Sequence, residues 1–336
     1  MNAIESGRNT MKAAVYEKYG APEVVHIEDV KKPVPKDNEV LVKIHATTVN
    51  SADWRLRSLN VPAGFGILVR LGFGIFGPRH PILGMELAGV IESVGKDVTK
   101  FKVGDAVFAS ADFDCHAEYR TIPEDGPIAY KPANLSFEES AALSFGGETA
   151  LYFLRDRGKI QNGEKVLVNG ASGTVGLAAV QIAKYFGAEV TGVCSTASVD
   201  LVKSVEADNV IDYTKEDFTQ NGKTYDIIVD TAGTAPWGRC NNSLTPSGRL
   251  LVVLGSLCDM VQAPFVSSKG GKTVITGTAV GSAENAQLLA LLAAQGKFKP
   301  VIDRSYTFEQ IVEAHAYVDT GHKRGSVVIS MVDPNE

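Results

Sequence analysis

The stretch KVLVNGASGTVGLAAVQIAKYF, residues 165–186, decides the fold. It opens with a short apolar run, residues 165–169, that is typical of a buried β-strand. From Thr174 to Phe186 apolar residues recur at helical spacing. Between the two lies a turn with glycines at 170, 173 and 176. A strand, a glycine-rich turn and a helix in this order predict a turn that binds the phosphates of a dinucleotide.

The chemistry of phosphate binding explains the glycine spacing. Gly173 lets a pyrophosphate approach the backbone, and Gly176 lets the helix lie close to the strand. The helix N-terminus offers free N–H groups and a partial positive charge. Ala171 stands where the usual first glycine would be, so an ordinary tight turn is the alternative reading. We assign the whole turn to the cofactor: Gly170, Ala171, Ser172, Gly173, Thr174, Val175 and Gly176.

Strands and helices alternate on both sides of this turn. This pattern predicts an α/β fold with a doubly wound parallel sheet over residues 132–296. The expected strands are 165–169, 189–194, 209–212, 225–230, 249–255 and 272–280, and the expected helices are 136–142, 174–186, 199–206 and 284–295.

The rest of the chain has a β texture. Residues 11–131 hold short period-two strands separated by turn residues, and β texture returns in residues 297–336. The simplest topology inserts the α/β domain into one discontinuous β-rich domain, made of 11–131 and 297–336. Residues 1–10 are polar and are predicted to be a disordered leader.

Composition narrows the class of protein. The chain has 336 residues, enough for two domains, and a net charge of −6, which argues against nucleic acid as the main partner. Its four cysteines show no paired spacing, so a reducing, cytoplasmic setting is expected. Residues 61–76 are apolar but carry Arg70, four glycines and a proline. We interpret them as a loop over a core or as a lid on an apolar substrate pocket, and not as a membrane segment.

The end of the second strand of the α/β domain indicates which nucleotide binds. An acidic residue there would bind the ribose 2′-hydroxyl of NADH, but the strand runs into Ser195 and Thr196, with no acid until Asp200. Hydroxyl groups favour a 2′-phosphate, so we expect NADPH, with NADH the less favoured cofactor. Lys203 or Tyr213 is a candidate to hold this phosphate; a solvated lysine and a packed tyrosine are the alternatives.

From Met11 onward the chain resembles the medium-chain dehydrogenase/reductase superfamily, in its zinc-free quinone oxidoreductase or enone reductase branch. The resemblance lies in five stretches: MKAAVYEKYGAPE, EVLVKIHATTVNSADWRLR, PILGMELAGVIESVGKDVTKFKVGDAVF, GASGTVGLAAVQIAKYFGAEVTGV and GHKRGSVVIS. It implies a GroES-like catalytic domain, a Rossmann domain and hydride transfer from a nicotinamide between them.

The sequence departs from the zinc alcohol dehydrogenases of that superfamily. Asn50 falls at or next to the place of their cysteine ligand, and Met85 takes the place of their histidine ligand. Catalytic zinc needs three protein ligands, so we expect no metal.

The resemblance also implies site residues. Asn50 would polarise the substrate carbonyl or orient the nicotinamide ribose, although it is also a candidate turn cap. Asp53 would move a proton, or would cap a helix. Glu148 stands where similar sequences carry an apolar residue, and no role is assigned to it. Further cofactor contacts implied by the resemblance are Thr149, Leu254, Gly255, Ser256, Arg324 and Ser326.

The sequence therefore predicts an NADPH-dependent reductase of apolar quinones or α,β-unsaturated carbonyls. Two alternatives stay open: a zinc-dependent alcohol dehydrogenase and an NADPH-binding regulatory relative without turnover. The resemblance suggests a homodimer that pairs through the apolar strand 272–280.

Overall fold

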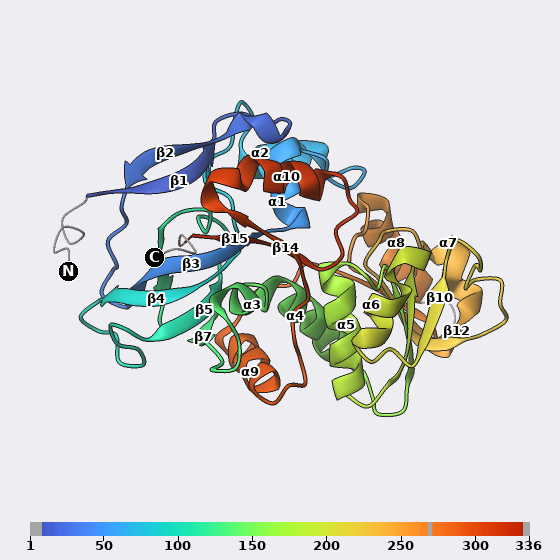
Figure 1. Cartoon of the computed structure of the whole chain (residues 1–336). Helices are drawn as coiled ribbons and strands as arrows, with labels where there is room; N and C mark the ends of the chain where they lie inside the picture. The colour runs from blue at the N-terminus through green and yellow to red at the C-terminus, as the bar shows by residue number, and fades with distance from the viewer. Residues whose placement is uncertain (1–8, 268–270, 332–336) are drawn as a thin grey trace.

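The computed structural model describes residues 9–267 and 271–331. Figure 1 shows two halves, one built on a parallel sheet and one on a mostly antiparallel sheet. The strands are β1 Thr10–Tyr16, β2 Val25–Lys31, β3 Glu39–Val49, β4 Glu86–Val94, β5 Ala106–Ser110, β6 Tyr119–Pro123, β7 Ile128–Tyr130, β8 Lys165–Asn169, β9 Glu189–Cys194, β10 Asn209–Asp212, β11 Tyr225–Asp230, β12 Leu244–Val252, β13 Thr273–Thr276, β14 Ile302–Thr307 and β15 Ser326–Ser330. The helices are α1 Ser51–Ser58, α2 Gly66–Phe73, α3 Phe137–Ala141, α4 Ser144–Leu151, α5 Thr174–Tyr185, α6 Val199–Ser204, α7 Trp237–Cys240, α8 Leu257–Ser267, α9 Ala283–Ala294 and α10 Ile311–Asp319.

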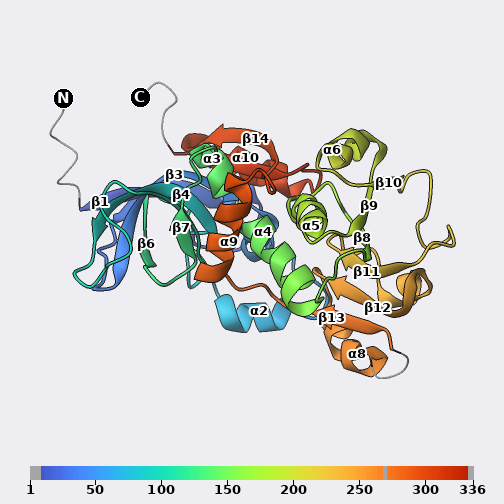
Figure 2. The ribbon, with the colours of Figure 1, turned by 90° about the horizontal axis from the view of Figure 1, so that it is seen from below.

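The parallel sheet has six strands in the order β10-β9-β8-β11-β12-β13. Every neighbouring pair in it is parallel. The order reverses at β8, and α5, which follows β8, is buried along one face. Figure 2 views the same sheet from below, with α5 beside β8 and β9 and α8 beside β13. The predicted Rossmann-type sheet is confirmed.

The second sheet has the order β14-β15-β3-β4-β5-β7, with β6 also paired to β3. Strand β15, near the end of the chain, lies antiparallel to β3, with Val327 opposite Val49. Strands β1 and β2 form a separate two-stranded sheet. The tail of the chain therefore joins the β-rich half, while the residue limits of the two domains remain a prediction.

One apolar core connects the two halves. Its largest cluster joins Ala46, Ala88 and Phe108 of the β-rich sheet to side chains of α4 and α5. Next to this cluster, α3 packs against β3, β4 and β5, and α4 packs against β5.

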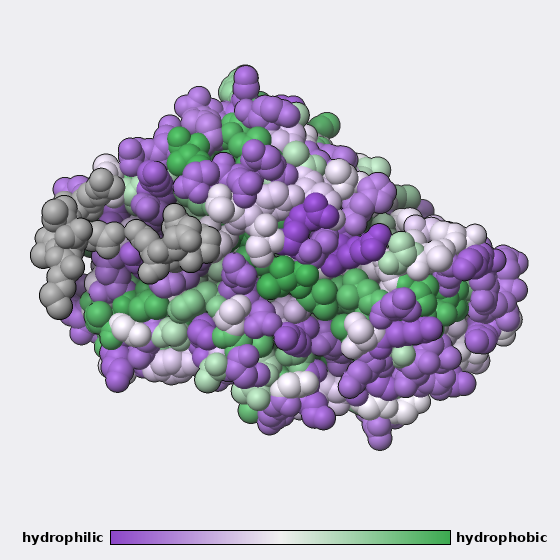
Figure 3. Space-filling view, in the orientation of Figure 1, coloured by the Kyte–Doolittle hydropathy of each residue, from purple (hydrophilic) through white to green (hydrophobic). Residues whose placement is uncertain are grey.

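The surface is polar over wide areas. On the face drawn in Figure 3, hydrophobic residues gather in a narrow band that crosses both halves. Within residues 9–267 and 271–331, no helix is both long enough and apolar enough to cross a membrane.

Several element predictions need correction. Residues 61–76, expected to be a loop, contain the helix α2, whose end is marked by Gly74 at φ +130°. Its four glycines hid a helix whose apolar residues Ile67, Leu68 and Leu71 are exposed, so no amphipathic pattern marked it. Strand β13 covers only part of the predicted 272–280.

Other limits shift by smaller amounts. Strand β12 begins and ends earlier than the predicted 249–255, and α6 ends before the predicted 206. Helix α3 begins at the predicted capping box of Ser136 and Glu139. Most of the predicted leader 1–10 lies outside the described residues, but Thr10 already belongs to β1.

A buried ion pair fastens α1 to α10. The Arg57 guanidinium is completely buried and donates to both carboxylate oxygens of Asp319, at 2.5 and 2.6 Å. It also donates to the carbonyl of Gly20 at 2.5 Å. A buried cation is tolerated only while its partners remain in place.

We expect Asp319→Ala to lower the free energy of unfolding by about 3 kcal/mol, because it leaves the guanidinium buried without its counter-ion. Urea denaturation measures this change. Asp37→Ala is the matched control: it breaks an ion pair with Lys96 whose side chains are 66% and 72% exposed, and its effect should stay within about 0.5 kcal/mol. Equal effects in the two variants would contradict the prediction.

Candidate active site

The glycine-rich turn has the geometry of a phosphate cradle. Gly170 lies at φ +82°, and a Cβ on Gly176 would collide with the carbonyl oxygen of Gly170. Gly173 is the N-cap residue of α5 and has no side chain to occupy the helix end. A Cβ there would meet only the Gly170 oxygen, at 3.7 Å. The glycine N-cap therefore leaves the first N–H groups of α5 without a capping side chain of its own, so that they can bind an anion.

The other residues of the turn attach it to the sheet. Ala171, in the place of the usual first glycine, is fully buried, and its N–H donates to the carbonyl of Val193 at 2.9 Å. Ser172 and Val175 are half-buried. The alanine thus preserves the turn while packing under it.

A lysine that the sequence analysis missed lies at the same helix end. Lys323 donates from Nζ to the hydroxyl of Thr174 and to the carbonyl of Gly325, the latter at 3.1 Å. Thr174 donates in turn to Gly325 at 2.7 Å. Burial lowers the pKa of Lys323 to about 8, against the opposing charge of Glu86. A cation therefore lies at the N-terminus of α5, 149 residues away from it in sequence.

The turn after β9 collects the groups expected around a 2′-phosphate. Arg324 donates from Nη1 to the carbonyl of Ala197 at 3.1 Å. Residues 195–198 contain no arginine, and Arg324 brings a guanidinium to this turn from the C-terminal tail. Tyr213 is 63% exposed, so the packed alternative is wrong, and its N–H donates to Cys194 at 3.0 Å. Lys203 is exposed on α6.

One carboxylate in this region was not foreseen. Asp212, at the end of β10, accepts from the Thr196 hydroxyl at 2.6 Å and pairs with Lys215 at 3.1 Å. The hydrogen bonds from Thr196 and Thr214 hold the pKa of Asp212 far below its usual value. Asp212 lies on the neighbouring strand β10, so an inspection of the residues that directly follow Ser195 does not find it.

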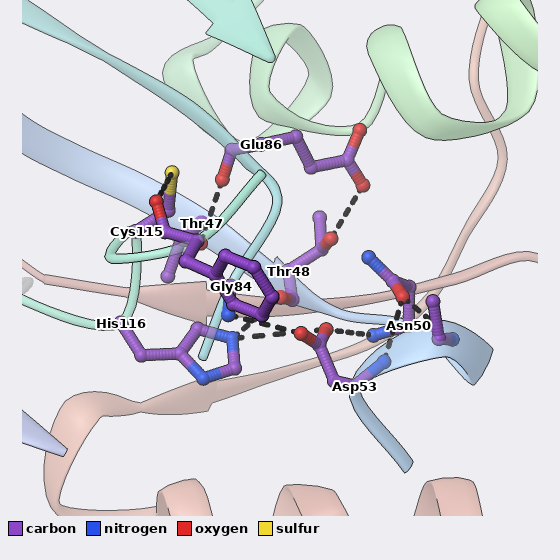
Figure 4. Close-up of polar contacts among 10 residues, drawn as sticks. Thr47, Thr48, Asn50, Asp53, Gly84, Glu86, Cys115 and His116 are labelled. Atoms are coloured by element: carbon purple, nitrogen blue, oxygen red, sulfur yellow. Dashed lines mark hydrogen bonds and ion pairs between the residues drawn. The ribbon is translucent and has the colours of Figure 1, made fainter. Parts of the chain in front are cut away.

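Asn50 and Asp53 form a capping box at the start of α1 (Figure 4). The Asn50 side-chain oxygen accepts from the N–H groups of Ala52 and Asp53 at 2.8 and 3.2 Å, and Asp53 accepts from the Asn50 N–H at 2.9 Å. Both cap readings therefore describe real contacts. The Asn50 Nδ2 atom is buried and has no hydrogen-bond partner among the residues described. This orphaned donor is what a ribose hydroxyl or a carbonyl oxygen would satisfy.

Asp53 is completely buried, which separates it from solvent. It also accepts from the Gly84 N–H at 2.9 Å, and His116 lies 3.9 Å away. Burial raises the pKa of Asp53, although its hydrogen bonds and His116 oppose this. His116 binds the carbonyl of Thr48 at 2.9 Å. These contacts hold Asp53 against the backbone of Asn50 and Gly84.

A second buried carboxyl lies directly above Asn50 in Figure 4. Glu86, at the start of β4, accepts from the Thr48 hydroxyl and from the Phe145 N–H, the latter at 2.7 Å. Burial raises its pKa to about 7.

Glu148, which had no assigned role, joins this region from α4. One of its oxygens accepts from the Ser110 hydroxyl at 3.0 Å. Ser110 in turn lies opposite Glu86 across β4 and β5. The sequence signal for Glu148 was its departure from an apolar position.

The remaining predicted cofactor contacts lie on α4, at the start of β15 and directly after β12. Thr149 on α4 donates to Phe145 at 2.7 Å, and Ser326 is buried with its N–H on Val301. Ser256 caps the unforeseen helix α8 through Asp259. Leu254 lies beside Gly233, and both Leu254 and Gly255 follow β12, which ends at Val252.

The donors here are not those of a metal centre. Across the described ranges, no three His, Cys, Asp or Glu side chains come together as a group able to hold a metal ion. By resemblance, Asn50 falls at or next to the place of the cysteine ligand of the alcohol dehydrogenases, and Met85 falls at the place of their histidine ligand.

Stability measurements distinguish the capping role of the Asn50 side-chain oxygen from any role of its amide nitrogen. Asn50→Ala should lower the free energy of unfolding by about 1 kcal/mol through loss of the cap. Asn50→Ser keeps a cap oxygen and removes the orphaned amide donor, so its stability should stay within about 0.5 kcal/mol of the parent. Urea titrations of the two variants provide the comparison. An equal loss in both would show that the amide, and not the cap, stabilises α1.

Two family models match the chain. The model described as alcohol dehydrogenase GroES-like domain matches residues 36–142, and the one described as zinc-binding dehydrogenase matches residues 205–329.

Curated relatives match over nearly the whole chain. A 2-methylene-furan-3-one reductase of Solanum lycopersicum is 33% identical over 95% of this chain and 79% of its own length. A quinone oxidoreductase of Sus scrofa is 33% identical over 96% of this chain and 98% of its own. Among solved structures, the quinone oxidoreductase from Coxiella burnetii superimposes with a TM-score of 0.84 at 27% identity, over 96% of this chain and 100% of that one.

Proposed function

Because the chain belongs to the medium-chain dehydrogenase/reductase superfamily, in its quinone oxidoreductase branch, we propose that it reduces quinones or α,β-unsaturated carbonyls with NADPH and without zinc. Membership of this family implies a nicotinamide cofactor. The observation that carries the proposal is the buried, unpartnered amide donor of Asn50, in the position where a related alcohol dehydrogenase carries a zinc ligand.

The residues around the turn fit a dinucleotide. The open N-terminus of α5 and the ammonium group of Lys323 would hold the pyrophosphate. Nicotinamide, once bound, supplies the hydride. Asn50 would donate from Nδ2 to the substrate oxygen, where negative charge develops during reduction. Asp53 keeps Asn50 in place by fixing its backbone.

Reduction of a conjugated carbonyl suits this weaker donor. Hydride addition to an enone or a quinone places charge on an oxygen that is conjugated with the accepting carbon, so one amide hydrogen bond contributes usefully. Oxidation of a simple alcohol requires stronger stabilisation of an alkoxide, which zinc provides in related enzymes.

The nucleotide preference rests on the turn after β9. Ser195, Thr196 and Arg324 offer hydroxyl and guanidinium donors, which support a 2′-phosphate. Asp212 is the charge that opposes it, but Thr196, Thr214 and Lys215 already engage its oxygens.

Assembly and location are further parts of the proposal. Among residues 9–267 and 271–331, strand β13 is an edge of the six-stranded sheet, next to β12, which supports a homodimer formed through that edge. The four cysteines are free, in agreement with a reducing, cytoplasmic setting.

The direct test is NADPH oxidation across a panel of quinones and enones with a metal chelator present. We expect turnover of at least one apolar member, unaffected by the chelator, and about 100-fold less in Asn50→Ser, because one oxyanion donor is lost. Stoichiometric zinc with alcohol oxidation would establish the alcohol dehydrogenase instead. Tight NADPH binding without any turnover would establish the regulatory relative.

Arg324→Leu tests the nucleotide preference. The variant should raise the Kd for NADPH about tenfold or more, since a charged hydrogen bond to the phosphate is lost. Its Kd for NADH should change little, as measured by fluorescence titration. Arg157→Leu is the control, because that exposed arginine donates to the Tyr152 hydroxyl on a different segment of the chain. Equal weakening of both nucleotides would contradict the assignment.

A further inference from the structure

The buried carboxyl of Glu148, which lies near those of Glu86 and Asp53, has no part in the function proposed above. Its side chain is only 6% exposed. It is enclosed by α4, by Ser110 at the end of β5 and by Gly281 in the segment between β13 and α9. A Cβ on Gly281 would lie 3.0 Å from Oε2 of Glu148 and would collide with the Ser110 hydroxyl. The carboxyl group is therefore held in place by three separate segments.

Hydrogen bonds distinguish Glu148 from its neighbour Glu86. Both oxygens of Glu86 accept, from Thr48 and from the Phe145 N–H, which is the pattern of a carboxylate. Only Oε1 of Glu148 accepts a hydrogen bond, from Ser110, and Oε2 has no partner within the described part of the chain. Oε1 of Glu148 is thus held by Ser110, and Oε2 is left available to a bound ligand, as an acceptor or, when protonated, as a donor.

Burial and the surrounding charges favour the protonated state of Glu148. Burial is the largest cause that raises the pKa of Glu148 to about 8, the charge of Glu86 adds to it, and the Ser110 hydrogen bond opposes it. Lys323 is the cation that faces Glu86. A cation is thus among the charges that act on Glu86, and none is among those that act on Glu148.

Glu86 is the residue that relates Glu148 to Asn50, because its charge acts on Glu148 and its carboxylate binds Thr48. Ser110 lies opposite Glu86 across β4 and β5, Glu86 binds Thr48, and Thr48 precedes Asn50 by two residues. Thr149, the next residue on α4, is a predicted nicotinamide contact. Glu148 thus belongs to the polar cluster that contains the proposed carbonyl donor.

We propose that Glu148 is the proton donor of the reduction, oriented by Ser110. This inference rests on the proposed function. A donor whose pKa lies near the working pH is efficient, and a carboxyl group kept neutral by an apolar surrounding can serve in this role.

With an enone as substrate, hydride addition and proton transfer account for all atoms and electrons. The substrate accepts a hydride at its β-carbon from the reduced nicotinamide, which is thereby oxidised by two electrons, and the π electrons move to the carbonyl oxygen. The O–H bond of Glu148 breaks, a new O–H bond forms on that oxygen, and the bonding pair stays on Glu148 as a carboxylate. The resulting enol rearranges to the ketone, and a proton from water restores Glu148.

The test compares wild type with Glu148→Gln, which keeps the acceptor for Ser110 and removes the acidic proton. In wild type, kcat should be constant at low pH and fall above about pH 8, because the acid must be protonated. Glu148→Gln should lose about 100-fold in kcat and lose this basic limb, with the KM for NADPH unchanged. Glu284→Gln, an exposed glutamate at the start of α9, is the control and should behave as wild type.

Two further measurements keep the inference testable if Glu148→Gln misfolds or if chemistry does not limit kcat. In ligand-free protein labelled with carbon-13 at glutamate carboxyls, one resonance should titrate near pH 8 and vanish in the variant. Ser110→Ala should move that titration and the basic limb to higher pH, because the hydrogen bond that lowers the pKa of Glu148 is removed.

The outcomes separate the two proposals. Wild-type turnover together with unchanged kcat and pH profile in Glu148→Gln overturns the proton donor alone. A Glu148 resonance that titrates in the usual carboxylate range also overturns it. Absence of wild-type turnover on the whole panel overturns the proposed function, and this inference with it.

Discussion

The contact between the C-terminal tail and the N-terminus of α5 is the interaction on which the site depends. Thr174 donates to Gly325, and Lys323 donates to both, although these residues are about 150 positions apart in sequence. Strand β15 begins directly afterwards and pairs with β3, which ends at Val49, next to Asn50. One short segment therefore positions the proposed phosphate turn and the proposed carbonyl donor relative to each other.

Buried polar groups without partners have two different meanings in this molecule. The Asn50 amide nitrogen lies at the start of α1 and has no partner among the described residues, which supports the proposal that a ligand accepts from it. His315 is also buried, with neither ring nitrogen partnered, but it lies against His116 beneath α1, and burial lowers its pKa well below the usual value. A neutral imidazole in that position is a packing element whose polar atoms cost stability.

Sequence reasoning succeeded where local chemistry determines structure. The glycines at 170 and 176 are required by backbone geometry, and Ser136 with Glu139 forms the expected capping box. It failed where tertiary contacts decide. Helix α2 has an exposed apolar face, which no periodicity argument identifies as helical.

The missed site residues have the same explanation. Lys323 looks like a surface lysine in a basic tail, and only the pairing of β15 with β3 brings it to α5. Asp212 approaches Thr196 from a neighbouring strand. Glu148 was visible as an unusual residue, but its meaning depends on Ser110, Gly281 and Glu86, which come from three other segments.

The balance of charge explains why an acidic residue is tolerated inside this core. An ionised Glu148 would add a negative charge near Glu86 and Asp53 in a region with little solvent, and that charge would also oppose the oxyanion that Asn50 is proposed to stabilise. Protonation of Glu148 removes this conflict, because the carboxyl is then a neutral donor. The proton is released only when the substrate oxygen becomes negative, so Glu148 would ionise as the substrate loses its charge, and the total charge of the cluster would stay constant during the transfer.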